Sequence, residues 1–134
     1  MKVNIIQLST HGDERGSLIS IENNRDINFD IKRAYYIFDT KIGVRRGFHA
    51  HKKLKQLLVV VSGSCRVLLD NGKDKKEVLL DRPDQGLVID SLIWREMFDF
   101  SHDCVLMVLA DQFYDESDYI RDYEKFISYI NNKA

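Results

Sequence analysis

The chain contains 134 residues, of which 44% are hydrophobic and 31% are charged, with 20 basic side chains against 21 acidic ones. A chain of this length is expected to form one domain with a core large enough to fold without disulfides or a structural metal. The net charge of −1 argues against a general nucleic-acid-binding protein, because such a protein needs a basic surface to displace counterions from phosphates.

Short strands separated by turns account for most of the chain. Residues 17–21 alternate between polar and apolar side chains, and residues 31–38 are rich in β-branched and aromatic side chains. The Asn71-Gly72 step between two apolar runs predicts a hairpin, since both residues accept a positive φ. Further strands are predicted at residues 56–61, 65–69, 77–80, 86–89, 94–98 and 104–110. About eight or nine short strands at this spacing indicate an all-β sandwich or a small barrel.

The C-terminal part of the chain changes to the period of a helix. Apolar residues recur there at intervals of three and four, at Ile120, Tyr123, Ile127 and Ile130. Acidic residues within residues 115–118 suit the positive end of a helix dipole. We therefore expect a single domain over residues 1–134, with a β-barrel over about 1–112 and a C-terminal α-helix over about 115–131.

Both cysteines, Cys65 and Cys104, lie inside apolar runs, which is typical of reduced and packed thiols in a cytosolic protein. The apolar stretch near the N-terminus is too short for a signal peptide, and no small-residue cleavage site follows it. No apolar run approaches the roughly 18 residues that cross a bilayer. We therefore expect a cytoplasmic protein without membrane contacts.

Two histidines stand one residue apart in the segment Arg46-Gly47-Phe48-His49-Ala50-His51. In an extended segment the side chains of residues i and i+2 project from the same face, so His49 and His51 are expected to point together. Two such imidazoles suit either a metal ion or proton transfer between neighbouring atoms of a substrate. The other histidines, His11 and His102, lie in turn-like sequence, and we assign neither of them a catalytic role.

The spacing around this pair resembles the first signature motif of the cupin superfamily, whose members form double-stranded β-helix barrels, also called jelly-roll barrels. The corresponding positions are Gly43, His49, His51, Gln56 and Gly63. Metal-binding cupins carry a glutamate ligand where this chain has Gln56 and a third histidine where it has Arg95. A guanidinium is not a ligand for a cation, and two imidazoles fall short of the usual three protein ligands of a catalytic metal. The resemblance therefore implies a cupin barrel without a metal.

A closer resemblance covers nearly the whole chain. Residues 13–18 and 46–49 resemble the paired motifs of the dTDP-sugar 3,5-epimerase branch of cupins. More specifically, five blocks in order resemble the dTDP-4-keto-6-deoxyglucose 3,4-ketoisomerases: residues 33–40, 46–53, 63–67, 94–97 and 114–121. The resemblance implies an isomerase of dTDP-3-amino-3,6-dideoxyhexose biosynthesis, which serves lipopolysaccharide or another surface glycan. It also implies a homodimer with exchanged N-terminal strands and a downstream PLP-dependent aminotransferase.

The reaction of that family moves a carbonyl from C4 to C3 of the hexose through an enediol, without net oxidation. It requires no nicotinamide or other cofactor, and the sequence contains no Gly-rich cofactor loop. It requires a base with a pKa near neutrality and a second group that moves protons between the two oxygens. We predict His49 as the base at C3 and His51 as the relay, although the two roles can be exchanged. Tyr35 is predicted to donate a hydrogen bond to the carbonyl oxygen.

The predicted substrate is a dTDP-linked 4-keto-6-deoxyhexose, and arginines are expected to bind it. Arg46 is the leading candidate for the diphosphate, because a guanidinium forks onto phosphate oxygens. By resemblance, Arg15 reaches the substrate of the neighbouring subunit, and Arg33 and Arg95 complete the substrate-binding set. The Arg15-Gly16 step resembles the enzymes that form the galacto-configured product, which we therefore favour.

Two other functions remain open from the sequence. A dTDP-4-keto-sugar 3,5-epimerase shares the motif around His49, but that branch uses a catalytic tyrosine with a His–Asp pair, and the neighbouring His51 favours isomerisation. A non-catalytic nucleotide-sugar-binding cupin would keep Arg46 without needing both histidines. A metal-dependent dioxygenase is disfavoured by Gln56 and Arg95.

Overall fold

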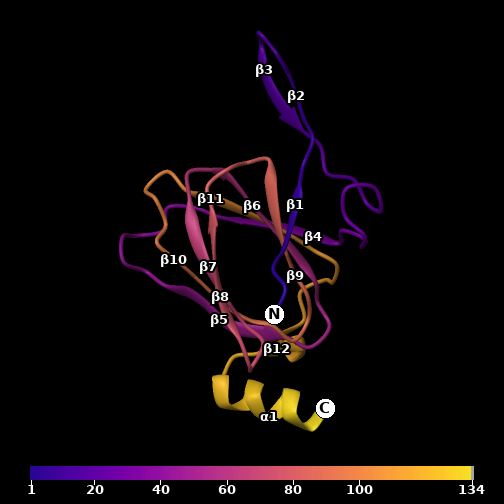
Figure 1. The fold of residues 1–134 in the computed structure, drawn as a ribbon, viewed down its shortest axis with the longest axis vertical. Coiled ribbons are helices and arrows are strands. Elements are labelled where there is room, and N and C mark those ends of the chain that lie inside the picture. Colours follow the sequence, from indigo (N-terminus) through magenta and orange to yellow (C-terminus); the bar gives the residue numbers. More distant parts are fainter. Residues whose placement is uncertain (134) are drawn as a thin grey trace.

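Two five-stranded antiparallel sheets face each other in the computed structural model, which describes residues 1–133 (Figure 1). The first sheet has the order β1 (Asn4–Gln7), β9 (Gln85–Ile89), β6 (Gln56–Ser62), β11 (Val105–Ala110) and β4 (Arg33–Ile37). The second has the order β12 (Tyr119–Ile120), β5 (Arg46–His51), β10 (Trp94–Phe98), β7 (Cys65–Asp70) and β8 (Lys75–Leu80). These two layers form the all-β jelly-roll barrel that the cupin resemblance implied, and the strand pattern predicted a sandwich or a small barrel. The hairpin predicted at Asn71-Gly72 joins β7 to β8.

The main core lies between the two sheets, where alternate residues of each strand point inward. Leu58 and Val60 of β6 and Leu106 and Val108 of β11 are at most 1% exposed in this core. Burying one such side chain contributes about 1.5–3 kcal/mol to stability. Because β6 and β11 are central strands, they carry apolar side chains on both faces, which explains their continuous apolar sequence.

The outer face of the first sheet carries a second apolar cluster. Leu57, Val59 and Leu109 pack there against Ile27 and Phe29, which come from the segment between β3 (Gly16–Ile19) and β4. This segment covers only part of the sheet. The two cysteines, which belong to β7 and to the turn before β11, are buried and free, in agreement with the prediction of packed thiols.

The C-terminal helix α1 spans Tyr123–Lys133, so the predicted start of this helix at residue 115 is wrong. The preceding residues form the short 3₁₀ helix η1 (Glu116–Asp118) and the strand β12. The side chain of Asp115 accepts the backbone N–H of Ser117 at 3.0 Å, which caps this single turn. The chain then pairs with β5 through Tyr119 and Ile120, because strand pairing at the barrel outweighs continuation of the helix.

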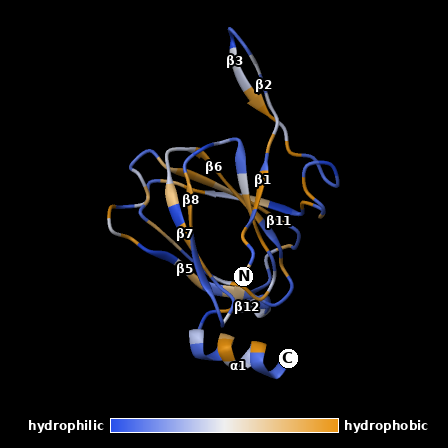
Figure 2. Cartoon of the chain, in the orientation of Figure 1, coloured by the Kyte–Doolittle hydropathy of each residue, from blue (hydrophilic) through white to orange (hydrophobic). Residues whose placement is uncertain are grey.

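Helix α1 packs against the outside of the second sheet. Turns of alternating hydrophobic and hydrophilic colour in Figure 2 show its amphipathic character. Phe126 is fully buried and packs with Trp94 and Ile120. The hydroxyl of Tyr123 donates a hydrogen bond to Asp70 at 2.7 Å. No helix within residues 1–133 has the length and apolar character that a membrane span requires.

The N-terminal hairpin projects away from the barrel (Figure 1). It consists of β2 (Thr10–Asp13) and β3, which pair with each other from Thr10↔Ile19 to Asp13↔Gly16. The predicted strand at residues 17–21 is therefore correct over its first three residues. Every residue of the hairpin strands except Ile19 is exposed.

Candidate active site

The side chains of His49 and His51 lie together on β5, as their spacing predicted. Their ring centroids are 5.0 Å apart, and the rings meet edge to face at 86°. On the neighbouring strand, Arg95 is the register partner of His49 and is almost completely buried. The pair therefore faces the interior of the barrel from one sheet, close to a guanidinium.

A β-bulge in β5 brings Arg46 to the same face of the sheet as the histidines. The register runs from Arg95↔His49 to Glu96↔Gly47 and Met97↔Arg46, so that Phe48 has no partner on β10. Gly47 and Phe48 have φ values of 94° and 57°, in the left-handed region where an extra residue is accommodated. Directly opposed residues share a face, and Met97 belongs to the core. Without the bulge, strict alternation would turn Arg46 to the outside.

His51 is fully buried, and its ring is held by a carboxylate from the far end of the chain. Its Nδ1 lies 3.0 Å from Oδ2 of Asp118, which is the last residue of η1. Its Nε2 is buried without a hydrogen-bond partner among residues 1–133. Burial lowers the pKa of His51 to about 2, and the nearby positive charge of Arg95 acts in the same direction. The imidazole is therefore neutral at physiological pH.

His49 is also neutral but has a different partner. Its Nδ1 lies 3.1 Å from the carbonyl oxygen of Gly47, within the bulge. Burial lowers its pKa to about 4, with a further contribution from the charge of Arg95. A neutral imidazole is the form that can accept a proton, so both histidines are in the protonation state of a base. Their pKa values nevertheless lie below the near-neutral value expected from the sequence, because both rings are buried beside the charge of Arg95.

A buried polar network adjoins the histidines. The Arg95 guanidinium donates to Oε1 of Gln56 at 2.6 Å, and Nε2 of Gln56 donates to the Tyr35 hydroxyl at 3.1 Å. Arg95 also donates to the carbonyl oxygen of Ile93 at 2.9 Å. Burial lowers the pKa of Arg95 to about 10 and raises that of Tyr35, so the first stays charged and the second stays protonated at neutral pH.

Aromatic side chains from residues 114–121 cover the histidines. The Tyr119 ring lies 5.0 Å from His49 and 4.4 Å from His51, between ring centroids. The Arg121 guanidinium lies 4.2 Å from the centroid of Tyr119. Glu116 accepts hydrogen bonds from Arg121 at 2.6 Å and from the Tyr114 hydroxyl at 2.5 Å. The segment is thus tied to itself while it lies over the site.

Arg33 of β4 lies beside these aromatic side chains. Its guanidinium lies 5.1 Å from the ring centroid of Tyr35 and 5.5 Å from that of Tyr114. Its Nε and one terminal nitrogen are buried and have no hydrogen-bond partner among residues 1–133. Unpaired buried guanidinium donors are costly, so these nitrogens are free to donate to an acceptor group of a ligand.

The structure brings most of the predicted site residues together. His49, His51, Tyr35, Arg33 and Arg95 line one region of the barrel, and Arg46 lies on the same face of β5. Arg15 does not join them within one chain, because it stands at the tip of the hairpin, 2.7 Å from Asp13. Its predicted contact with substrate therefore requires a second copy.

The contribution of residues 114–121 does not follow from the sequence alone. In the sequence, Asp118 is one of the acidic residues expected at the start of a helix. No sequence pattern singles out Tyr119. Similarity of this block to the ketoisomerases points to the segment but not to these contacts. Gln56 stands at the position of a metal ligand, and its place between Tyr35 and Arg95 shows instead that it joins a polar network. Within residues 1–133 no group of three His, Cys, Asp or Glu side chains is placed to hold a metal ion.

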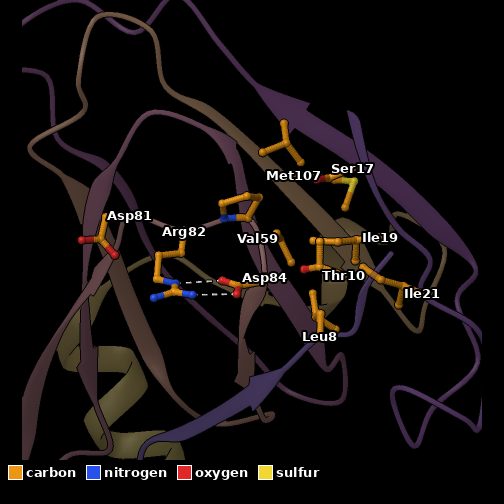
Figure 3. Close-up of a pocket in the computed structure, with 12 residues that line it drawn as sticks. Leu8, Thr10, Ser17, Ile19, Ile21, Val59, Asp81, Arg82, Asp84 and Met107 are labelled. Carbon is orange, nitrogen blue, oxygen red and sulfur yellow. Dashed lines mark hydrogen bonds and ion pairs between the residues drawn. The ribbon is translucent and has the colours of Figure 1, made fainter. Parts of the chain in front are cut away.

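A separate groove of about 590 Å³ lies at the base of the hairpin. Figure 3 shows Leu8, Ile19 and Ile21 on one side of it and the ion pair between Arg82 and Asp84 on the other. That ion pair has an N–O distance of 2.8 Å. The groove lies on the outer face of the first sheet, away from the histidines.

Comparisons with known proteins agree with this site. The family model FdtA (WxcM-like, C-terminal) matches residues 1–131. TDP-4-oxo-6-deoxy-alpha-D-glucose-3,4-oxoisomerase from Aneurinibacillus thermoaerophilus is 55% identical over 130 residues, covering 97% of this chain and 94% of the relative. The 3,4-ketoisomerase QdtA from Thermoanaerobacterium thermosaccharolyticum, solved as a mutant in complex with TDP-4-keto-6-deoxyglucose, is 44% identical with a TM-score of 0.95, covering 98% and 95% of the two chains.

The epimerases are more distant. A dTDP-4-dehydrorhamnose 3,5-epimerase from Bacillus anthracis has a TM-score of 0.75 at 15% identity, covering 87% of this chain and 76% of its own. This similarity shows the shared cupin-type barrel alone. Sequence similarity, in contrast, shows the family of this chain. The evidence is the match of the family model over residues 1–131 and the relative with 55% identity. The chain belongs to the FdtA, WxcM-like family of sugar 3,4-ketoisomerases.

Proposed function

We propose that the protein converts dTDP-4-keto-6-deoxyglucose into a dTDP-3-keto-6-deoxyhexose. The observation that carries this proposal is the pair of neutral, buried histidines whose ring centroids lie 5.0 Å apart. The substrate is supported by the relatives, since one is named for the TDP-4-oxo sugar and another was solved with TDP-4-keto-6-deoxyglucose bound. C3 and C4 of a hexose are adjacent, so proton-transfer groups at this separation suit the reaction.

The reaction is a series of proton transfers. His49 takes the proton from C3, which leaves an enediolate with its charge on the C4 oxygen. His51 takes the proton from the C3 oxygen and gives it to the C4 oxygen. The protonated His49 then delivers a proton to C4, which regenerates the base and completes the 3-keto sugar. Tyr35 donates a hydrogen bond to the reacting oxygen, because its hydroxyl accepts from Gln56 and keeps its own proton free. A general base of this kind contributes about 10²–10⁴-fold in rate.

Arginines bind the diphosphate of the substrate. Arg33 supports this role through its buried unpaired nitrogens, and Arg46 supports it through its position on the histidine face of β5. Both present the forked donors that match phosphate oxygens. Arg95 is bonded to Gln56 and to Ile93, so it acts on the sugar end of the site mainly through its positive charge.

The reaction proceeds without a metal. The donor set argues against a cation, because Arg95 places a positive charge beside both histidines and lowers the pKa of each. Gln56, at the position of the cupin glutamate, has no anionic oxygen and is bonded to Tyr35 and Arg95. A metal ion there would lack both a third protein ligand and charge compensation.

The active enzyme is a homodimer in which the hairpins are exchanged. The outer face of the first sheet leaves Tyr36 of β4 and Val61 of β6 exposed, and the apolar groove at the hairpin base adjoins it. Leu18 is also exposed on the hairpin. A second copy that covers this face would place Arg15 in the partner's site.

The product is the galacto-configured 3-keto sugar, and a PLP-dependent aminotransferase converts it into a 3-amino sugar for a surface glycan. The support for the configuration is the Arg15-Gly16 step of the hairpin. A ketone at C3 is the group that transamination converts into a 3-amino group. The buried free thiols of Cys65 and Cys104 are compatible with a cytoplasmic location.

The test is incubation with dTDP-4-keto-6-deoxyglucose in deuterated water, followed by NMR at C3, C4 and C5. The 3-keto product with deuterium at C4 is expected, and coupling to an aminotransferase then reveals the C4 configuration. His49→Asn and His51→Asn are expected to lower turnover by at least about 10²-fold, while His102→Asn serves as the control. Exchange at C3 and C5 without a 3-keto product would indicate an epimerase, and binding without exchange would indicate a non-catalytic protein. Loss of activity on chelation would contradict metal independence.

A mixing experiment tests the exchanged dimer. Arg15→Ala and His49→Asn are each expected to be nearly inactive alone. In a mixed dimer, the subunit with an intact His49 receives an intact Arg15 from its partner. Mixing and re-equilibrating the variants is therefore expected to restore up to about one quarter of the wild-type activity, since half the dimers are mixed and each has one complete site. No recovery in dimers shown to be mixed would contradict the exchange.

A further inference from the structure

Asp118 holds the ring of His51 from a fixed backbone position. Its Oδ2 lies 3.0 Å from Nδ1 of His51. The same carboxylate accepts the backbone N–H of Lys53 at 2.9 Å and of Leu54 at 3.4 Å, and the backbone carbonyl oxygen of Asp118 accepts the N–H of Lys52 at 2.9 Å. Four contacts therefore connect this one residue to the end of β5 and the residues after it.

The contact determines which nitrogen of His51 carries the proton. An ionised carboxylate only accepts hydrogen bonds, so Nδ1 of His51 donates and Nε2 keeps its lone pair. Nε2 is buried and has no partner among residues 1–133. The His51 ring lies beside Tyr119 and His49, at centroid distances of 4.4 Å and 5.0 Å. The unprotonated nitrogen therefore belongs to the candidate site.

The two histidines differ in how each can carry a positive charge. Nδ1 of His49 contacts a neutral carbonyl oxygen, whereas Nδ1 of His51 contacts a carboxylate. The positive charges near His51 belong to Arg95, Arg33 and Arg121, and all of them oppose a further positive charge on His51. The negative charge of Asp118, in direct contact with the ring, offsets this opposition when His51 takes up a proton.

We infer that Asp118 is a positioning residue for the isomerisation, which fixes the His51 tautomer whose Nε2 accepts a proton from one substrate oxygen and returns it to the next. The inference rests on the proposed function for the reaction that it serves. The O–H bond at C3 breaks as the Nε2–H bond forms, and that bond then breaks as the O–H bond at C4 forms. His51 ends neutral, and its Nδ1–H bond to Asp118 is kept throughout.

The test is the isosteric substitution Asp118→Asn, with the His51 tautomer measured by two-dimensional ¹⁵N NMR of ligand-free protein. Wild type is expected to show the Nδ1–H form. In D118N the side-chain NH₂ group can face Nδ1, and the Nε2–H form is then expected. The kcat is expected to fall by about 10²–10⁴-fold with KM changed less than about threefold. The backbone amide resonances of Lys53 and Leu54 show separately whether the turn beside β5 keeps its structure in the variant.

Two further variants separate positioning from simple support of the fold. Asp118→Ala removes the carboxylate without offering a donor, so it is expected to lower kcat less than D118N does. Asp115→Ala loosens the same turn without touching His51, so it is expected to lower the melting temperature while the tautomer and kcat stay near wild type. An unchanged tautomer or an unchanged kcat in D118N would overturn the inference. If wild type lacked isomerase activity, the proposed function would fail, whereas the tautomer measurement would still decide the role of Asp118.

Discussion

The bulge in β5 can be tested by giving Gly47 a side chain. A Cβ at this position would lie 2.9 Å from the carbonyl oxygen of Arg95 and 3.1 Å from Cα of Glu96. Both are backbone atoms of β10, so they cannot rotate away as a side chain would. Gly47 also has a φ of 94°, which costs a residue with a Cβ about 1–2 kcal/mol. With the steric contact added, Gly47→Ala is expected to lower the free energy of unfolding by about 3 kcal/mol.

Gly43→Ala is the matched control. Gly43 also has a positive φ, of 81°, but a Cβ there would meet no atom within 4 Å. This variant is therefore expected to lose only about 1–2 kcal/mol. Urea unfolding followed by the fluorescence of Trp94 measures both, and kcat/KM is expected to fall more for Gly47→Ala because Arg46 moves with the bulge. If the free energies of unfolding of the two variants differ by less than about 0.5 kcal/mol, the backbone of β10 does not restrict position 47 as described.

Three other predictions concern the helix α1, the protonation of His51 and the binding role of Arg33. Phe126→Ala is expected to lower the free energy of unfolding by about 3–5 kcal/mol, measured by urea titration, because the fully buried ring leaves a cavity under α1. The pKa of His51 is about 2 in the folded protein and about 6.5 in the unfolded chain, so the unfolded state binds more protons below pH 6.5. The free energy of unfolding is therefore expected to fall by about 2.5 kcal/mol between pH 7 and pH 4.5 because of His51 alone. The same titration of His51→Asn is expected to lack this part of the loss, and an identical pH dependence would contradict it. Arg33→Gln is expected to weaken TDP binding by about 10–100-fold, measured by calorimetry. It is not expected to lower the melting temperature, because it removes a guanidinium that is buried without a hydrogen-bond partner within residues 1–133. Arg25→Gln, at an exposed arginine, is expected to change neither the affinity nor the melting temperature.

The barrel could be predicted from the sequence because local patterns and tertiary packing agree in most strands. Residues 94–98 and the Asn71-Gly72 hairpin illustrate this agreement. The start of the C-terminal helix could not be predicted, because the period of Ile120 and Tyr123 fits a helix equally well. Residue 120 is in a strand and not in the helix because Ile120 pairs with Ala50 of β5, which is far away in the sequence.

The candidate site was predictable where neighbouring residues suffice. The spacing of His49 and His51 alone places both on one face of a strand. The position of Arg46 was not predictable in this way, because its face depends on the register shift opposite Phe48. The contact of Asp118 with His51 joins residues 67 positions apart, and no local pattern indicates such a pair.

The strand β12 also has a consequence for how the chain avoids associating with other chains. It pairs with the last two residues of β5, Ala50 and His51, and so covers that end of the strand's outer edge. An open edge of this kind invites pairing with other chains. The segment that fixes His51 is therefore also expected to block strand pairing at this end of the edge. A substitution that detaches residues 115–121 is expected to remove the catalytic arrangement and this protection together, so that selection against aggregation helps to keep the site intact.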